Sequence, residues 1–453
     1  MPLTSPHYRP LIMPEYKFHP ARITIKHWQL RDLISTPKCS PGQMFYPCDR
    51  AIHSLDLSNG KDTVVADFDF EPRCLQTTTN VIIGGGLQDL TDIRDTGRDS
   101  RLSASPARGL FAVHNRYTGD YYSGELGDFI NNAVSLYEES PTRLRAVVCN
   151  NDCSLYFTDI HTSSFEVSES IKLTSPLNHA AVSPDGKMIV ACGDTPKLMM
   201  LSQGESQGWS LNKVFDSKSD RGFSVAFHPS GVVFGAAFED GMARLYDTRS
   251  LKMPLAEIKT TRPMEMNGAF RCLKFSTGPE DLVFISEQMH RVHIVDLRDF
   301  QNHQVLTVPT LLSPPPPSND NDHDDSSSGP TLSSPALSSS PSPPSASSSS
   351  PSASSSAPRP VLQSFEEVMG VAYDAGSEFD RYRVNNGYFD PSTQAYTPAY
   401  ARYSRYGHDD SGISGLTWSE HDGGCLVVGT DTGVGLWKVD GWGRRTFPAY
   451  SIC

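Results

Sequence analysis

Two Asp-x-Arg triplets are the residues of this sequence whose type and spacing best suit recognition chemistry. They run from Asp247 to Arg249 and from Asp296 to Arg298, so that the two aspartates are 49 positions apart. A guanidinium presents several N–H donors in a rigid fork that matches a carboxylate or a carbonyl oxygen. Two hypotheses stay open. Either both arginines point outward and form a docking surface for another protein, or each aspartate closes a turn and each arginine pairs with a neighbouring blade.

Patterns of catalytic or cofactor-binding residues are not found in the sequence. The glycine run Gly84–Gly86 is not followed by the Gly-Lys-Ser/Thr of a phosphate loop, so we interpret it as a turn. Two acidic pairs, at residues 67/69 and 366/367, have no recognisable acid–base partner, and no G-x-S-x-G elbow is present. The 14 histidines occur singly and the nine cysteines form no C-x-x-C pair, which argues against a metal site. We therefore expect no catalytic residue, no cofactor, no metal and no enzymatic activity.

The elements that position the Asp-x-Arg triplets are predicted by an internal repeat. Three segments each contain an apolar strand, a turn with Pro or Gly, and a second apolar strand. They begin near His179, Ser224 and Arg271, at intervals of 45 and 47 residues. A strand repeat of this period is typical of propeller blades. We predict an all-β fold, a single closed β-propeller of about seven four-stranded blades, with six or eight as alternatives because the N-terminal copies are degenerate.

Composition along the chain predicts four segments. We expect an extended N-terminal arm over residues 1–22, the first part of the propeller over 23–310, a disordered insert over 311–360, and a Tyr-rich return segment with the final blade over 361–453. Residues 23–34 and 44–57 are predicted to form strands of the first blade. Ser and Pro make up 32 of the 50 residues of the insert, which leaves too little apolar surface to offset the entropy of ordering it. Closure of the ring requires that the last blade be completed by N-terminal sequence or by residues 444–452.

The insert also contains five Ser-Pro pairs. They are candidate sites for proline-directed phosphorylation, each of which adds a charge of about −2. An unselected spacer is the alternative hypothesis. The five serines are Ser313, Ser334, Ser340, Ser342 and Ser350.

Charge and hydropathy disfavour several kinds of partner. The net charge of −13 argues against nucleic acid and anionic membranes, since both require clustered Lys and Arg. The first 20 residues have no apolar signal core, and no stretch approaches the roughly 18 apolar residues of a membrane span. We expect a cytoplasmic or nuclear protein, or both, with reduced cysteines and with neither nucleic acid nor membrane as a partner.

The repeats resemble the WD-repeat family of β-propellers, over about residues 23–308 and 362–450. Trp437 occupies the place of the signature tryptophan, and Tyr246 holds the same place in an earlier copy. The Gly-His signature is essentially absent, so the hydrogen-bond network of the family cannot be complete in most blades. The stretch Gly268–Phe300 resembles a short domain of unknown function found in fungal WD-repeat proteins.

The resemblance implies a non-catalytic protein–protein interaction scaffold whose partners are not identified. In this family, adjacent Asp-x-Arg ends resemble the box through which substrate receptors of cullin-RING ubiquitin ligases dock their adaptor. A substrate receptor that docks through Asp247, Arg249, Asp296 and Arg298 is therefore the alternative, and a propeller enzyme is a third, less favoured hypothesis. In either binding role we expect a monomeric propeller inside a larger complex.

Overall fold

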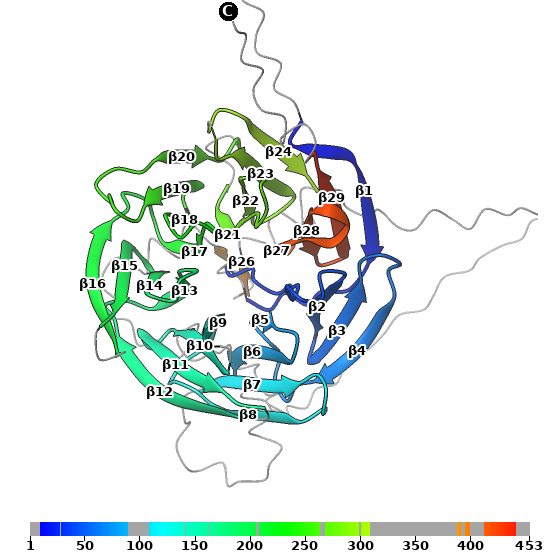
Figure 1. Ribbon diagram of the computed structural model, residues 1–453, viewed down its shortest axis with the longest axis vertical. Helices are drawn as coiled ribbons and strands as arrows, with labels where there is room; N and C mark the ends of the chain where they lie inside the picture. Colours follow the sequence, from blue (N-terminus) through cyan, green and yellow to red (C-terminus); the bar gives the residue numbers. More distant parts are fainter. Residues whose placement is uncertain are drawn as a thin grey trace, which may run out of the picture.

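The computed structural model of the chain is an all-β ring of seven blades around a central axis (Figure 1). The predicted blade number is confirmed, and the alternatives of six and eight are wrong. The residues that the structure describes are 10–27, 29–88, 108–140, 142–162, 164–204, 208–262, 268–298, 300–308, 387–390, 395–398 and 412–440. The predicted insert, residues 311–360, lies outside these ranges.

Each blade is an antiparallel sheet in which the strands follow one another from the axis outward (Figure 1). Blade 1 contains β2 (Gln43–Cys48), β3 (Ala51–Asp56) and β4 (Asp62–Asp67). Blade 2 contains β5 (Cys74–Thr77), β6 (Val81–Leu87), β7 (Gly109–Asn115) and β8 (Tyr121–Glu125). Blade 3 contains β9 (Asn131–Ser140), β10 (Arg143–Asn150), β11 (Ser154–Ile160) and β12 (Phe165–Lys172).

The second half of the ring follows the same order. Blade 4 contains β13 (Leu177–Val182), β14 (Met188–Gly193), β15 (Thr195–Gln203) and β16 (Trp209–Asp216). Blade 5 contains β17 (Gly222–Phe227), β18 (Val233–Phe238), β19 (Met242–Asp247) and β20 (Ala256–Lys259). Blade 6 contains β21 (Phe270–Phe275), β22 (Leu282–Glu287), β23 (Arg291–Asp296) and β24 (His303–Thr307). Within the return segment, β25 (Gly387–Asp390) pairs with β26 (Ala395–Pro398).

Blade 7 closes the ring with strands from both ends of the chain. Its inner strands are β27 (Ile413–Ser419), β28 (Cys425–Thr430) and β29 (Gly433–Val439), and the short helical turn η1 (His421–Gly423) links the first two. Its outermost strand is β1 (Ile12–Pro20), which pairs antiparallel with β29. Of the two predicted modes of closure, completion by N-terminal sequence is therefore the one that the structure shows.

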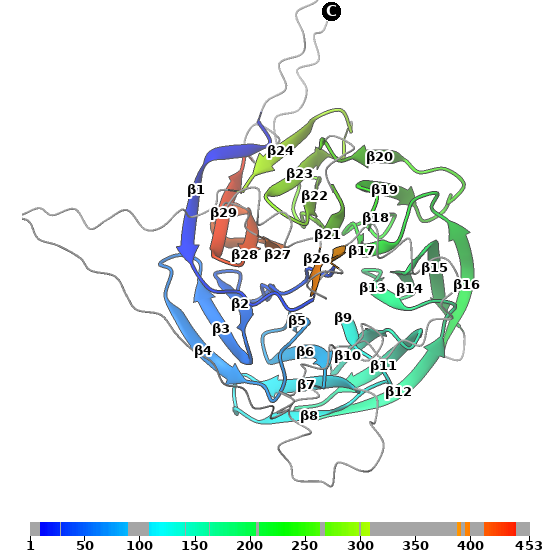
Figure 2. The ribbon, with the colours of Figure 1, turned by 180° about the vertical axis from the view of Figure 1, so that it is seen from behind.

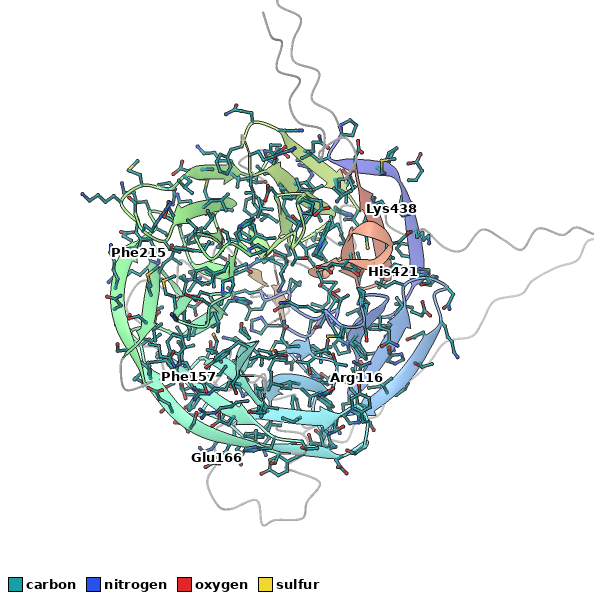
Figure 3. The ribbon with its side chains drawn as sticks, viewed as in Figure 1. Arg116, Phe157, Glu166, Phe215, His421 and Lys438 are labelled. Atoms are coloured by element: carbon teal, nitrogen blue, oxygen red, sulfur yellow. The ribbon has the colours of Figure 1, made fainter. Side chains whose placement is uncertain are left out.

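The hydrophobic core lies between the blades. The described residues form seven buried apolar clusters, and each cluster joins two neighbouring blades, including blade 7 to blade 1. Phe157 of blade 3, for example, stacks on Trp209 of blade 4 with ring centroids 5.6 Å apart (Figure 3). Phe215 of blade 4 likewise meets Tyr246 of blade 5 edge to face at 5.4 Å (Figure 3). Because there are seven such clusters for seven blades, every blade packs against an apolar neighbour on both of its sides.

The sequence explains why these hairpins form. The second strands, such as β18, β22 and β28, are almost wholly buried because both of their faces meet neighbouring blades. The turns before β14 and β18 contain Gly186 and Gly231, each with a φ of +70°, a conformation that L side chains rarely adopt.

Two local predictions are wrong. The run from Ile23 to Ile34 was expected to be a strand of the first blade. The described residues of this run, 23–27 and 29–34, contain no strand. Blade 1 has a three-stranded sheet, and one bridge between Ser35 and Phe45 lies where its innermost strand would be. The glycine run Gly84–Gly86 lies inside buried strand β6 and not in a turn. The packing of this strand explains why the residues are glycines, since a Cβ there would collide with side chains such as Phe68 and Phe70.

Candidate functional site

The two Asp-x-Arg triplets close the last turns of blades 5 and 6. In blade 5, Asp247 accepts the backbone N–H of Arg249 at 2.9 Å, and its two carboxylate oxygens bind the Arg249 Nε and Nη2 at 2.9 and 2.6 Å. In blade 6, Asp296 makes the same three contacts with Arg298, at 3.0, 3.1 and 3.0 Å. Each aspartate thus closes its turn, and each arginine is held by the aspartate of its own triplet.

These arginines remain accessible despite their ion pairs. The Arg249 side chain is 74% exposed and the Arg298 side chain is 44% exposed. Both turns join a third strand to a fourth strand, so they lie on the same face of the ring. The hydrogen bonds from Arg249 lower the pKa of Asp247 to about 2, so this ion pair persists over the physiological range. The geometry is compatible with docking, which stays a prediction.

A different group of polar residues, which sequence reasoning missed, lies at the axis of the propeller. After β1, the chain runs to the middle of the ring before it enters β2 (Figure 2). Asp32 is buried there, and its carboxylate lies 3.0 Å from Lys274 Nζ, 3.2 Å from Gln76 Nε2 and 3.5 Å from His179 Nε2. We call these four residues the axial cluster. They connect the N-terminal segment to blades 2, 4 and 6.

The axial cluster is electrostatically matched. Burial alone would raise the pKa of Asp32, but the charges and hydrogen bonds of Lys274 and His179 lower it to about 2. Asp32 in turn raises the pKa of Lys274, against the effect of burial. His179 Nδ1 accepts the backbone N–H of Val225 at 3.4 Å, so both ring nitrogens of His179 contact the fold.

A second group, the arginine cluster, joins His27 and Arg31 of the same N-terminal segment to arginines of blades 2 and 6. It consists of His27, Arg31, Arg73 and Arg271. Burial and then the charges of the three arginines lower the pKa of His27 to about 3, and its Nδ1 accepts the backbone N–H of Gln29 and Leu30. Burial and then Arg271 lower the pKa of Arg31 to about 9. His27 is therefore neutral, and positive charge is concentrated around it.

Blade 6 contains a buried network of hydrogen bonds and ion pairs, although the hydrogen-bond network of the WD-repeat family is expected to be incomplete in most blades. Glu287 accepts hydrogen bonds from Thr260 Oγ1 at 2.7 Å and faces His293 Nε2 at 3.0 Å, and it also pairs with Arg262. His293 Nδ1 lies 2.8 Å from Nε2 of His303 on the outermost strand. The sequence signal for this network is a Glu at the end of an apolar strand, followed six residues later by a His.

The described ranges contain neither a metal-binding cluster nor a membrane-spanning helix. Within them, no group of three or more His, Cys, Asp or Glu side chains is arranged to hold a metal ion. In the same part of the chain, no helix has the length and hydropathy needed to cross a membrane. Eight cysteines of this part are free thiols, and burial raises the pKa of Cys149 well above its ordinary value. The five candidate phosphorylation serines lie outside the described residues.

Comparison with known proteins finds one matching domain and several relatives that cover part of this chain. Residues 268–307, which form blade 6, match an uncharacterised protein domain, DUF2415. The chain is 28% identical over 408 residues to the uncharacterised protein YLR149C of Saccharomyces cerevisiae, with 67% of this chain and 56% of the yeast protein covered. The chain thus spans just over half the length of that relative.

Two further relatives cover shorter stretches. The uncharacterised protein C4G3.03 of Schizosaccharomyces pombe is 24% identical over 291 residues, which cover 62% of this chain and 77% of that protein. Eukaryotic translation initiation factor 3 subunit I of Candida glabrata is 28% identical over 178 residues, which cover 37% of this chain and 50% of that subunit. Together with the seven-bladed ring, these matches support the resemblance of the chain to WD-repeat β-propellers, and the DUF2415 segment lies in its sixth blade.

Proposed function

We propose that this chain is a non-catalytic scaffold that binds other proteins as a subunit of a larger assembly. The observation that carries the proposal is the N-terminal segment at the axis, where Asp32 contacts side chains of three blades. Because the chain's own residues occupy the axis, the loops of the two faces and the rim are the surfaces that a partner can reach. Seven inter-blade cores support those loops.

The relative from Candida glabrata supports the assembly role, because its name describes a subunit of a translation initiation factor. The identity of the partner for this chain does not follow from that name. A location in the cytoplasm, the nucleus or both is part of the proposal and is tested by imaging a tagged chain.

The test is native purification of the full chain, tagged at its own locus. We expect stoichiometric co-purification with at least one other protein, at a native mass well above the 49.7 kDa of the chain. A chain that elutes alone at its monomer mass, from extracts prepared at physiological salt, contradicts the proposal.

A ubiquitin-ligase substrate receptor is the second candidate function. The observation that favours it is the exposure of Arg249 and Arg298 on the same face of neighbouring blades. Arg249→Ala with Arg298→Ala should then abolish recovery of a cullin adaptor. Arg143→Ala is the matched control, because Arg143 makes the same two-point contact with Asp159 in blade 3, at 3.1 and 2.9 Å. Adaptor recovery that is absent from the wild type, or equal in all three proteins, removes this candidate.

A further inference from the structure

The connection between β19 and β20 leaves two large apolar side chains in solvent. Met253 is 68% exposed and Leu255 is 47% exposed. The described chain has ten exposed large apolar residues, and seven of the others stand on outermost strands of the blades. Figures 1 and 2 show that the β19–β20 connection projects from the rim of the ring. We call residues 249–255 the blade 5 loop.

The blade 5 loop is fixed to the propeller at both of its ends. Thr248, just before it, donates its backbone N–H to Val232 at 2.8 Å, and Leu255 donates its own to Leu245 at 2.7 Å. Between them, Leu251 packs against the apolar cluster that joins blades 4 and 5. The loop therefore presents Met253 and Leu255 from a rigid base, which lowers the entropy cost of binding.

Cationic side chains flank this apolar pair. Arg249 is 74% exposed, and Asp247 holds two of its guanidinium nitrogens at 2.9 and 2.6 Å. Lys252 is also exposed, and within the described residues it forms no ion pair with an acidic side chain. An arginine that is already oriented loses little freedom when it binds, and Met and Arg are enriched at protein interfaces.

We propose that the blade 5 loop is the docking surface for a partner protein segment that presents an apolar side chain next to a carboxylate. This inference rests on the proposed scaffold function and names the surface that serves it. The apolar side chain covers Met253 and Leu255, and the carboxylate meets Arg249 and Lys252. The partner carries a carboxylate because Arg249 and Lys252 form a local group of cations on a chain whose net charge is −13.

The experiment places a photo-crosslinking amino acid at Met253 in the tagged full chain and maps the crosslinked peptide by mass spectrometry. The control position is Val214, which is 39% exposed on outermost strand β16 of blade 4. We expect a crosslink from position 253 to a partner peptide with Asp or Glu next to a large apolar residue, and none from position 214. A crosslink from 253 to a second copy of this chain, or to no protein of a purified assembly, overturns the inference.

Substitutions give an independent test on the same assembly. Met253→Asp with Leu255→Asp should reduce partner recovery at least tenfold, and Leu211→Asp with Val214→Asp should leave it unchanged. Arg249→Glu should reduce recovery and Arg249→Lys should retain part of it. An assembly that survives the blade 5 loop substitutions refutes only the docking surface, whereas a wild-type chain that purifies alone refutes the scaffold function itself.

Discussion

Replacement of Asp32 should destabilise the whole propeller, although this residue belongs to no strand. The axial cluster brings the Asp32 carboxylate to Lys274, Gln76 and His179, which lie on three different blades. Asp32→Asn keeps the shape of the side chain and removes its charge. Asp32→Ala also leaves the partly buried Lys274 and the buried His179 without their anionic partner.

The magnitude follows from the pKa of Asp32. A carboxyl whose pKa falls from 3.8 to about 2 on folding contributes about 2.5 kcal/mol of stability at neutral pH. Asp32→Asn should lose about that amount, and Asp32→Ala should lose about 3–5 kcal/mol, the usual cost of removing one partner of a buried pair. For a domain of this size, a loss of about 2.5 kcal/mol lowers the Tm by roughly 5–10 °C. Because the folded-state pKa is depressed, this contribution is present above pH 3.8 and is lost as the pH falls through about 2.

The assay is thermal unfolding followed by circular dichroism at pH 7. The control is Asp422→Ala, because Asp422 pairs with Lys438 at the surface with both side chains 53% exposed (Figure 3 labels Lys438), and it should leave the Tm within about 1 °C. Lys274→Met should cost less in the Asp32→Ala background than in the wild type, since the two residues are coupled. An Asp32→Ala protein that melts with the wild type would refute the structural role of the axial cluster.

Three further predictions concern closure, pH and the insert. Deletion of residues 1–20 removes β1 and exposes the edge of β29, so the shortened chain should aggregate or melt at a much lower temperature, as followed by size-exclusion chromatography and a thermal melt. Folded His27 has a pKa of about 3 against an ordinary 6.5, so its contribution to stability is complete above pH 6.5 and declines as the pH falls from 6.5 towards 3, by about 2 kcal/mol at pH 5. Urea unfolding at pH 7 and pH 5 checks this, and His27→Gln should flatten the dependence; an unchanged slope argues against a buried neutral His27. Excision of residues 311–360 should change the Tm by less than about 5 °C, because the cost of closing a loop grows slowly with its length, and a larger fall would mean that the insert packs on the ring.

The blades were predictable from the sequence because their signals are local. The segment from Gly222 to Asp247 shows two apolar strands, a Pro-Ser-Gly turn and a third strand, and all three strands form where the pattern places them. The same local pattern misled at residues 23–34, where Ile, Thr and Lys alternate as they do in a strand. A strand needs a continuous row of backbone hydrogen bonds with one neighbour. The backbone bonds of this segment instead go to different blades, from Thr24 to Pro47 and from Leu33 to Ser414.

The axial cluster could not have been predicted from the sequence. Asp32, His179 and Lys274 are separated by more than 90 positions and share no spacing that a motif could contain. Only closure of the ring brings them together, since each comes from a different part of it. The Asp-x-Arg triplets are the opposite case. Their turn chemistry is local and visible in the sequence, whereas the exposure of Arg249 depends on the packing of blades around it.

The most direct test is hydrogen exchange of the N-terminal segment in the intact chain, since the central claim is that residues of this segment occupy the axis. Leu33 donates its backbone N–H to Ser414 at 3.1 Å, and Ser35 donates its own to Phe45 at 3.0 Å. We predict that a peptide containing these two amides exchanges as slowly as peptides from the buried strand β28, and that Asp32→Ala accelerates its exchange. Exchange of this peptide within seconds in the wild-type protein would show that the axis is open, and would contradict the account.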